Sequence, residues 1–182
     1  GESSLAQGLY AFEFQAHALG DPNWPADVMT TEVQVDIFRE GFEAGWMEGL
    51  PAGWTTTFGL VEGTNFDDPH EGDFYYTAMP DANVFGQVTD TLWTPPLTVS
   101  NGDTFSFYVK KNDFLATTNQ VFARHYETGA TTLVGNLIGL PPNAYQQVVL
   151  DISSYQGVFA FGVTSAVEDF PGLCRFDLFE ST

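Results

Sequence analysis

Thr104-Phe105-Ser106-Phe107-Tyr108-Val109 carries large apolar side chains at every second position. A period of two places Phe105, Phe107 and Val109 on the same face of a β-strand. Residues 121–124 repeat this alternation, and residues 158–163 form a compact apolar run. Turn-forming segments separate the runs at 101–103, 128–129, 139–142 and 170–172. Short alternating runs between turns predict an all-β sandwich or barrel of antiparallel strands.

The composition also favours a β-fold, with a sizeable core. The 182 residues include 18 Gly and 10 Pro, which disfavour helix interiors, and 43% of the residues are hydrophobic. We expect one continuous β-domain over residues 31–182. Residues 1–30 differ from it and are expected to form an N-terminal extension, a single alternating strand followed by a Pro-containing linker at 21–25.

The net charge of −19, from 24 acidic and 5 basic residues, restricts the partners of the chain. Five basic side chains can neutralise only a few phosphates, which excludes nucleic acid as a partner. Anionic membranes are excluded likewise, and no apolar stretch approaches the about 20 residues of a membrane-spanning helix. The carboxylates repel each other unless salt or divalent cations screen them, and calcium is the natural candidate. Alternatively, the charge only keeps the protein soluble.

No motif of the sequence predicts catalysis. A nucleophile elbow, a zinc-binding His pair and a phosphate-binding glycine loop are all absent, and the three His residues show no ligand spacing. A glycosidase needs only two carboxylates, so the abundance of acids does not discriminate. The single cysteine, Cys174, shares one strand face with Phe176 and Leu178, which predicts a buried, inert thiol.

Four segments, in this order, resemble the choice-of-anchor J and cleaved-adhesin domain family. The first is a Phe-Glu pair at 42–43 followed by Leu50-Pro51-Ala52-Gly53-Trp54. The others are Leu92–Leu97 with its following strand, the strand pair at 145–150 and 158–161, and the closing strand at 176–178. The resemblance covers about residues 37–180. It implies a jelly-roll β-sandwich, related to the MAM domain and to some carbohydrate-binding modules.

The resemblance also implies a role and a metal site. Members of the family are mostly non-catalytic extracellular or cell-surface modules, often stabilised by calcium. An acidic residue of the Phe-Glu segment and the Asp of the last strand come together in the family. Carried over to this chain, the metal ligands are Glu43 and Asp177, with Glu40 a weaker candidate. Alternatively, these are ordinary exposed carboxylates at strand ends.

Two further sets of residues are candidates for ligand binding. The acidic segment at 65–73 supplies several oxygens for calcium, or is a plain acidic loop. Aromatic faces suit the apolar patches of sugar rings. Trp24 and Trp46 lie in Gly- and Pro-rich stretches and are the candidates for exposure, whereas Trp54 and Trp93 match structural positions of the family and are expected in the core. The pair Tyr75-Tyr76 is left open.

The N-terminal strand separates two functional hypotheses. Tyr10, Phe12 and Phe14 share one face of residues 9–17, which can join the chain's own sheet or the sheet of a neighbouring subunit. Donation to a neighbour would build a homopolymer, a structural subunit of an extracellular filament. The first hypothesis remains a secreted or surface-exposed, non-catalytic module that recognises a glycan or a protein.

Overall fold

The computed structural model describes residues 8–16, 27–35, 38–43, 49–57, 59–64, 68–78, 88–111, 118–167 and 174–182. The chain divides into two compact units, Gly1–Ile37 and Phe38–Thr182. Among the described residues, no helix is long and apolar enough to cross a membrane.

The first unit contains a two-stranded antiparallel sheet. Strand β1 (Gly8–Ala16) pairs with β2 (Asp27–Val35), with Gly8 opposite Val35 and Ala16 opposite Asp27. The strand expected at 9–17, with Tyr10, Phe12 and Phe14, therefore has a partner within the chain, and β2 crosses the domain boundary expected at residue 30. Donation of this strand to a neighbouring subunit stays a prediction.

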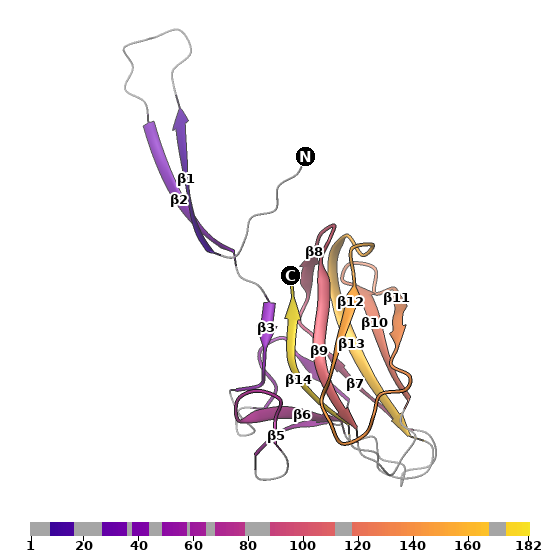
Figure 1. Cartoon of the computed structure of the whole chain (residues 1–182). Helices are drawn as coiled ribbons and strands as arrows, with labels where there is room; N and C mark the ends of the chain where they lie inside the picture. The colour runs from indigo at the N-terminus through magenta and orange to yellow at the C-terminus, as the bar shows by residue number, and fades with distance from the viewer. Residues whose placement is uncertain are drawn as a thin grey trace. The chain divides into compact units, whose positions relative to one another are not determined.

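The second unit is a sandwich of two antiparallel sheets, which confirms the predicted all-β jelly-roll class (Figure 1). The first sheet has the order β11-β10-β13-β7-β4, with β8 beside β13. Its strands are β4 (Thr55–Thr56), β7 (Val88–Trp93), β8 (Leu97–Val99), β10 (Thr118–His125), β11 (Thr131–Asn136) and β13 (Gly157–Val167).

The second sheet has the order β12-β9-β14-β6-β5, with β3 beside β14. Its strands are β3 (Phe38–Glu40), β5 (Leu60–Gly63), β6 (Phe74–Ala78), β9 (Thr104–Lys111), β12 (Gln146–Asp151) and β14 (Cys174–Ser181). Strand β14, yellow in Figure 1, is the last of the chain and pairs with β3, the first strand of this unit. The first and last strands of this unit are therefore hydrogen-bonded to each other.

Phenylalanine rings from both sheets fill the core. The alternation read in residues 104–109 places Phe105 and Phe107 of β9 completely inside. The ring of Phe105 stacks on that of Phe161 of β13 in the opposite sheet, with centroids 4.8 Å apart. Phe107 stacks on Phe179 of β14 at 5.2 Å. Each such aromatic pair contributes about 0.5–1.5 kcal/mol beyond its buried area.

Several residues left open by the sequence are structural. Tyr75 and Tyr76 of β6 are completely buried, which removes both from any surface for sugar rings. Cys174 is also buried, as predicted, and lies against the amide of Asn119, with the nitrogen 3.4 Å from the sulfur.

Candidate functional site

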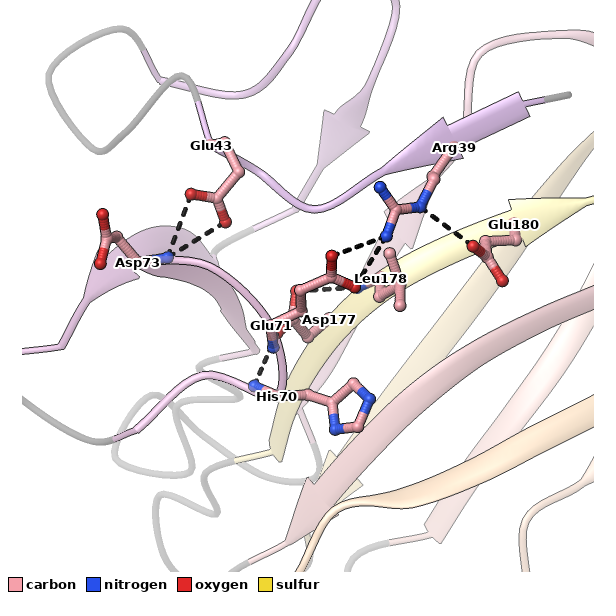
Figure 2. A network of polar contacts seen from close by, with 8 residues as sticks. All are labelled: Arg39, Glu43, His70, Glu71, Asp73, Asp177, Leu178 and Glu180. Carbon is pink, nitrogen blue, oxygen red and sulfur yellow. Dashed lines mark hydrogen bonds and ion pairs between the residues drawn. The ribbon is translucent and has the colours of Figure 1, made fainter. Parts of the chain in front are cut away.

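Backbone amides of a loop hold the carboxylate of Asp177 on the outer side of β14. The side chain is completely buried, although it belongs to an acid. Its Oδ2 atom accepts hydrogen bonds from the N–H groups of His70 at 2.7 Å and Glu71 at 3.0 Å (Figure 2). Its Oδ1 atom accepts one from the N–H of Leu178 at 2.7 Å. The described part of the acidic segment, residues 68–73, therefore covers Asp177.

The same loop also donates to Glu43. The carboxylate of Glu43 accepts the N–H of Asp73 at 3.0 and 3.3 Å. Gly72 makes this approach possible, because a Cβ atom on it would lie 2.0 Å from Oε1 of Glu43, and because its φ of +71° suits glycine. The candidate metal ligands and the described part of the acidic segment, which the sequence analysis treated separately, are thus in contact. We call Glu40, Glu43, Asp177 and the loop 68–73 the acid site.

Burial and like charges destabilise the ionised forms at the acid site. Burial raises the pKa of Asp177 to about 6; the three N–H donors oppose this shift and the charge of Glu43 adds to it. Burial also raises the pKa of Glu40, whose carboxylate accepts the N–H of Phe42 at 2.6 Å, and Glu43 again adds to the shift. Within the described ranges, no ion pair to a cationic side chain offsets the charge of Asp177.

Arg39 fastens the loop to the ends of the sandwich. Its guanidinium donates to both carboxylate oxygens of Glu71 at 2.7 Å and to Glu180 of β14 at 3.0 Å (Figure 2). All three side chains are substantially exposed, so solvent screens the pairs and their contribution to stability is small. Their effect is on position, since they join β3, the loop and β14.

Strained backbone flanks the acid site on both sides. Phe42, between Glu40 and Glu43, has a φ of 61°, and Leu178, next to Asp177, has a φ of 46°. Residues other than glycine rarely adopt such angles, which cost about 1–3 kcal/mol each and cluster at functional sites. The pairing of β14 with β9 shifts register between Asp177 and Glu180, and such a bulge changes the direction in which side chains point.

The donor set suits a hard cation. Carboxylate and carbonyl oxygens are the ligands of calcium, and Asp177 and Glu43 offer carboxylates that accept hydrogen bonds from the same loop. Among the described residues, however, no group of three His, Cys, Asp or Glu side chains is close enough to hold a metal. Any further ligands of an ion bound here would be backbone carbonyl oxygens or water.

The tryptophans are distributed differently from the prediction. Trp24 and Trp46 lie outside the described residues. Trp54 is buried in the core, as expected, against Phe42 and Phe179. The placement of Trp93 in the core was wrong, because Leu92 of β7 and Thr94, just after this strand, take the inward positions and leave Trp93 half-buried on the outer face. The alternation along β7 was the signal that could have placed it.

Trp93 belongs to a row of large side chains that crosses the outer face of the first sheet. In the strand pairing, Leu133 lies opposite Phe122, Phe122 opposite Gly162, and Gly162 opposite Trp93. The indole lies across Gly162, whose missing Cβ would be 2.7 Å from three ring carbons. Leu133 is exposed, and Phe122 is half-buried like Trp93. We call these four residues the Trp93 row.

A cation and a pocket adjoin the Trp93 row. The guanidinium carbon of Arg124 lies 4.3 Å from the centroid of the indole ring, a cation–π contact. Arg124 also lines a pocket of about 220 Å³. The other lining residues carry no carboxylate: they are Gly53, Thr55, Thr94, Pro96, His125, Tyr126, Gly129 and Ala160.

Comparisons with known proteins show the fold. No family model matches the sequence, and no curated protein matches it. Among solved structures, the K1 cleaved adhesin domain of Lys-gingipain from Porphyromonas gingivalis W83 is similar, with a TM-score of 0.59 and 15% identity over 81% of this chain and 98% of that chain. TmCBM61 in complex with β-1,4-galactotriose gives 0.56 and 15% over 78% and 93%.

A third structure, the CBM22-1 xylan-binding domain of Paenibacillus barcinonensis Xyn10C, gives a TM-score of 0.53 and 18% identity over 80% of this chain and 93% of that chain. The relation to choice-of-anchor J domains in particular stays a prediction. At these identities the likeness establishes the fold: this chain is a β-sandwich of the kind found in cleaved adhesin domains and carbohydrate-binding modules.

Proposed function

We propose that this chain is a non-catalytic module that acts outside the cell or at its surface and binds a glycan along the Trp93 row. The observation that carries the proposal is the row itself, in which Trp93 and Phe122 lie on either side of Gly162 and, with Leu133, leave apolar surface on the outer face of the sheet. The face of a sugar ring carries C–H groups that pack on aromatic side chains. Gly162 leaves room for the indole of Trp93 to lie against the sheet.

Two further observations favour a glycan over a protein partner. The pocket beside the row is lined by hydroxyl and imidazole groups, from Thr55, Thr94, Tyr126 and His125, which suit sugar hydroxyls. Similar folds include modules solved with galactotriose or named as xylan-binding. A protein partner at the same face remains the alternative that the binding experiment distinguishes.

The test is a glycan array followed by calorimetry with β-1,4-galactotriose and xylohexaose as first probes. We expect binding of at least one glycan and a loss of about tenfold in affinity for Trp93→Ala, since one aromatic stack is worth about 1.5 kcal/mol. Tyr145→Ala is the matched control. It also removes an aromatic side chain, but Tyr145 contacts His70 beside the acid site and does not belong to the Trp93 row. Equal losses in both variants, or an array without any bound glycan, would contradict the proposal.

The proposal includes a calcium ion held by Asp177 and Glu43, with Glu40 close by. Support comes from the buried carboxylate of Asp177, the raised pKa values of Asp177 and Glu40, and the absence of a paired cation among the described residues. A divalent ion would neutralise charges that now repel each other. It would also connect the segment after β3 to β14, which stabilises the first and last strands of the sandwich.

Thermal unfolding with calcium and with EDTA tests the ion. At calcium concentrations of about 100 times Kd, we expect a gain of about 2.7 kcal/mol, or a rise in Tm of about 5–10 °C. Asp177→Ala should remove most of this difference, whereas Asp151→Ala, at an exposed acid of β12, should retain it. The same Tm with calcium and with EDTA would remove calcium from the proposed function.

A further inference from the structure

Arg124 differs from the other described arginines in where its charge lies. Arg39 is paired with Glu71 and Glu180, and Arg175 is buried beside the ring of Tyr75. Arg124 instead lies over Trp93 on the outer face of the first sheet, half-buried, and pairs with no carboxylate among the residues described. In a chain of net charge −19, this is an unusual place for a positive group.

The cation–π contact with Trp93 prepares the guanidinium of Arg124 to bind an anion. A guanidinium on an aromatic ring uses its flat face for the contact, and its N–H groups point outward within its own plane. That fork matches the two oxygens of a carboxylate or a sulfate. Since the indole fixes the orientation of Arg124, less side-chain entropy is lost when an anion binds.

The pocket beside Arg124 adds a second donor and no competing acid. Its nine lining residues include no Asp or Glu, although the chain has 24. His125 accepts the N–H groups of Glu127 at 3.2 Å and Thr128 at 3.3 Å on Nδ1. The proton of the neutral imidazole is therefore on Nε2, which becomes a hydrogen-bond donor.

The overall negative charge does not cancel this local preference. At physiological ionic strength the Debye length is about 8 Å, so acids on the opposite sheet are largely screened from the pocket. Among the residues that line the pocket, the charge that an incoming group meets is that of Arg124. Glu127, in the turn next to Tyr126, is exposed and screened by solvent. Long-range repulsion from the other carboxylates acts mainly on the rate of association.

We propose that the Trp93 row and Arg124 together select an anionic sugar, whose carboxylate or sulfate group binds the guanidinium while its ring packs against the exposed side chains of the Trp93 row. This inference rests on the proposed function, since it names the class of glycan bound at the same site. Uronic acids and sulfated sugars share the required chemistry, and the experiment separates them.

The experiment compares ligands that differ only in charge. One arm measures binding of trigalacturonate and of its fully methyl-esterified form, which keeps ring and linkage and removes the charge. The other arm measures a 6-O-sulfated β-1,4-galactotriose and the unsulfated trisaccharide. With the full chain in 150 mM salt, we expect at least one charged ligand to bind tenfold or more tightly than its neutral counterpart.

Variants of Arg124 assign the preference to this residue. Arg124→Gln should remove the tenfold preference, because the charged ligand loses more affinity than the neutral one, and Arg124→Lys should retain part of the preference. Lys110→Gln, at a cation over Tyr145 on the second sheet, is the control and should keep the full preference. The Tm of each variant shows whether it is folded.

Every other outcome contradicts either this inference or the proposed function. Equal affinity for charged and neutral ligands overturns the inference and leaves the proposed function standing. Equal loss of both ligands in folded Arg124→Gln shows that Arg124 only supports Trp93, and also overturns it. An absence of binding to every glycan, charged or neutral, overturns the proposed function together with the inference.

Discussion

The acid site and the Trp93 row lie on opposite sheets of the sandwich. The first buries a polar side chain, whereas the second places large apolar side chains on the outer face. At the acid site, a carboxylate is buried under a loop, and the backbone on either side is strained. Along the Trp93 row, large apolar side chains face outward beside a cation. Groups placed against their own solvation preference mark both regions, but Asp177 is covered by its loop, whereas the side chains of the Trp93 row face outward. We infer that the first serves stability and the second recognition.

The largest effect that separates the two regions is expected from Gly72→Ala. The new Cβ atom would meet the carboxylate of Glu43 at 2.0 Å, and the φ of +71° would be strained for alanine. Glu43 would move away and lose the hydrogen bond from Asp73. Strain and the lost bond together should lower the free energy of unfolding by about 2–3 kcal/mol, measured by chemical denaturation.

Gly102→Ala is the matched control for that variant. Its φ is +94°, but no atom lies within 4 Å of the added Cβ. It should therefore show only the backbone strain, about 1 kcal/mol. Affinity for glycans should be unchanged in both folded variants. A loss of glycan affinity in Gly72→Ala alone would show that the two sheets are not independent.

A smaller effect, on the opposite sheet, is expected from Gly162→Ala. The added Cβ atom would lie 2.7 Å from the indole of Trp93, which must shift away from its place under Arg124. We expect glycan affinity to fall about tenfold by calorimetry, with a loss of stability of about 1 kcal/mol. Gly135→Ala, on β11 of the same sheet, has only Leu150 nearby at 3.4 Å and should leave affinity unchanged. Equal affinities in both variants would show that the position of the indole does not matter.

The sequence predicts the two regions to different extents. The alternation of β9 was enough for the fold class, and the resemblance was enough to bring Glu43 and Asp177 into consideration together. What covers them could not be predicted, because backbone N–H groups of residues 70–73 make the contacts, and every residue except proline has such a group. The positive φ of Phe42 and Leu178 has no sequence signal either, since both are poor choices for that conformation.

The Trp93 row was missed for another reason. The motif that contains Trp93 was interpreted by its resemblance to structural positions, whereas strand alternation alone would have placed Leu92 and Trp93 on opposite faces. The remaining members come from β10, β11 and β13, and only the register of three strand pairs brings them into one row. Register between distant strands depends on how whole sheets pack, which a short motif does not contain.

The smallest effect concerns the pH dependence of stability, and it distinguishes the acid site from the general acidity of the surface. The pKa of Asp177 is raised to about 6 from an ordinary value of 3.8, so the folded state binds a proton that the unfolded state has released. Without calcium, its contribution is fully present below about pH 4 and is lost as the pH rises through 6. Lowering the pH from 7 to 5 in EDTA should therefore add about 1 kcal/mol of stability from this group.

The control separates Asp177 from the other carboxylates. Their protonation also stabilises the fold at low pH, and the Asp177→Asn variant retains that general effect. The measured quantity is thus the difference between wild type and Asp177→Asn in their change of unfolding free energy with pH. An identical pH dependence in both proteins would mean that Asp177 is ionised without cost, and the distinction between the two regions would then rest on the Trp93 row alone.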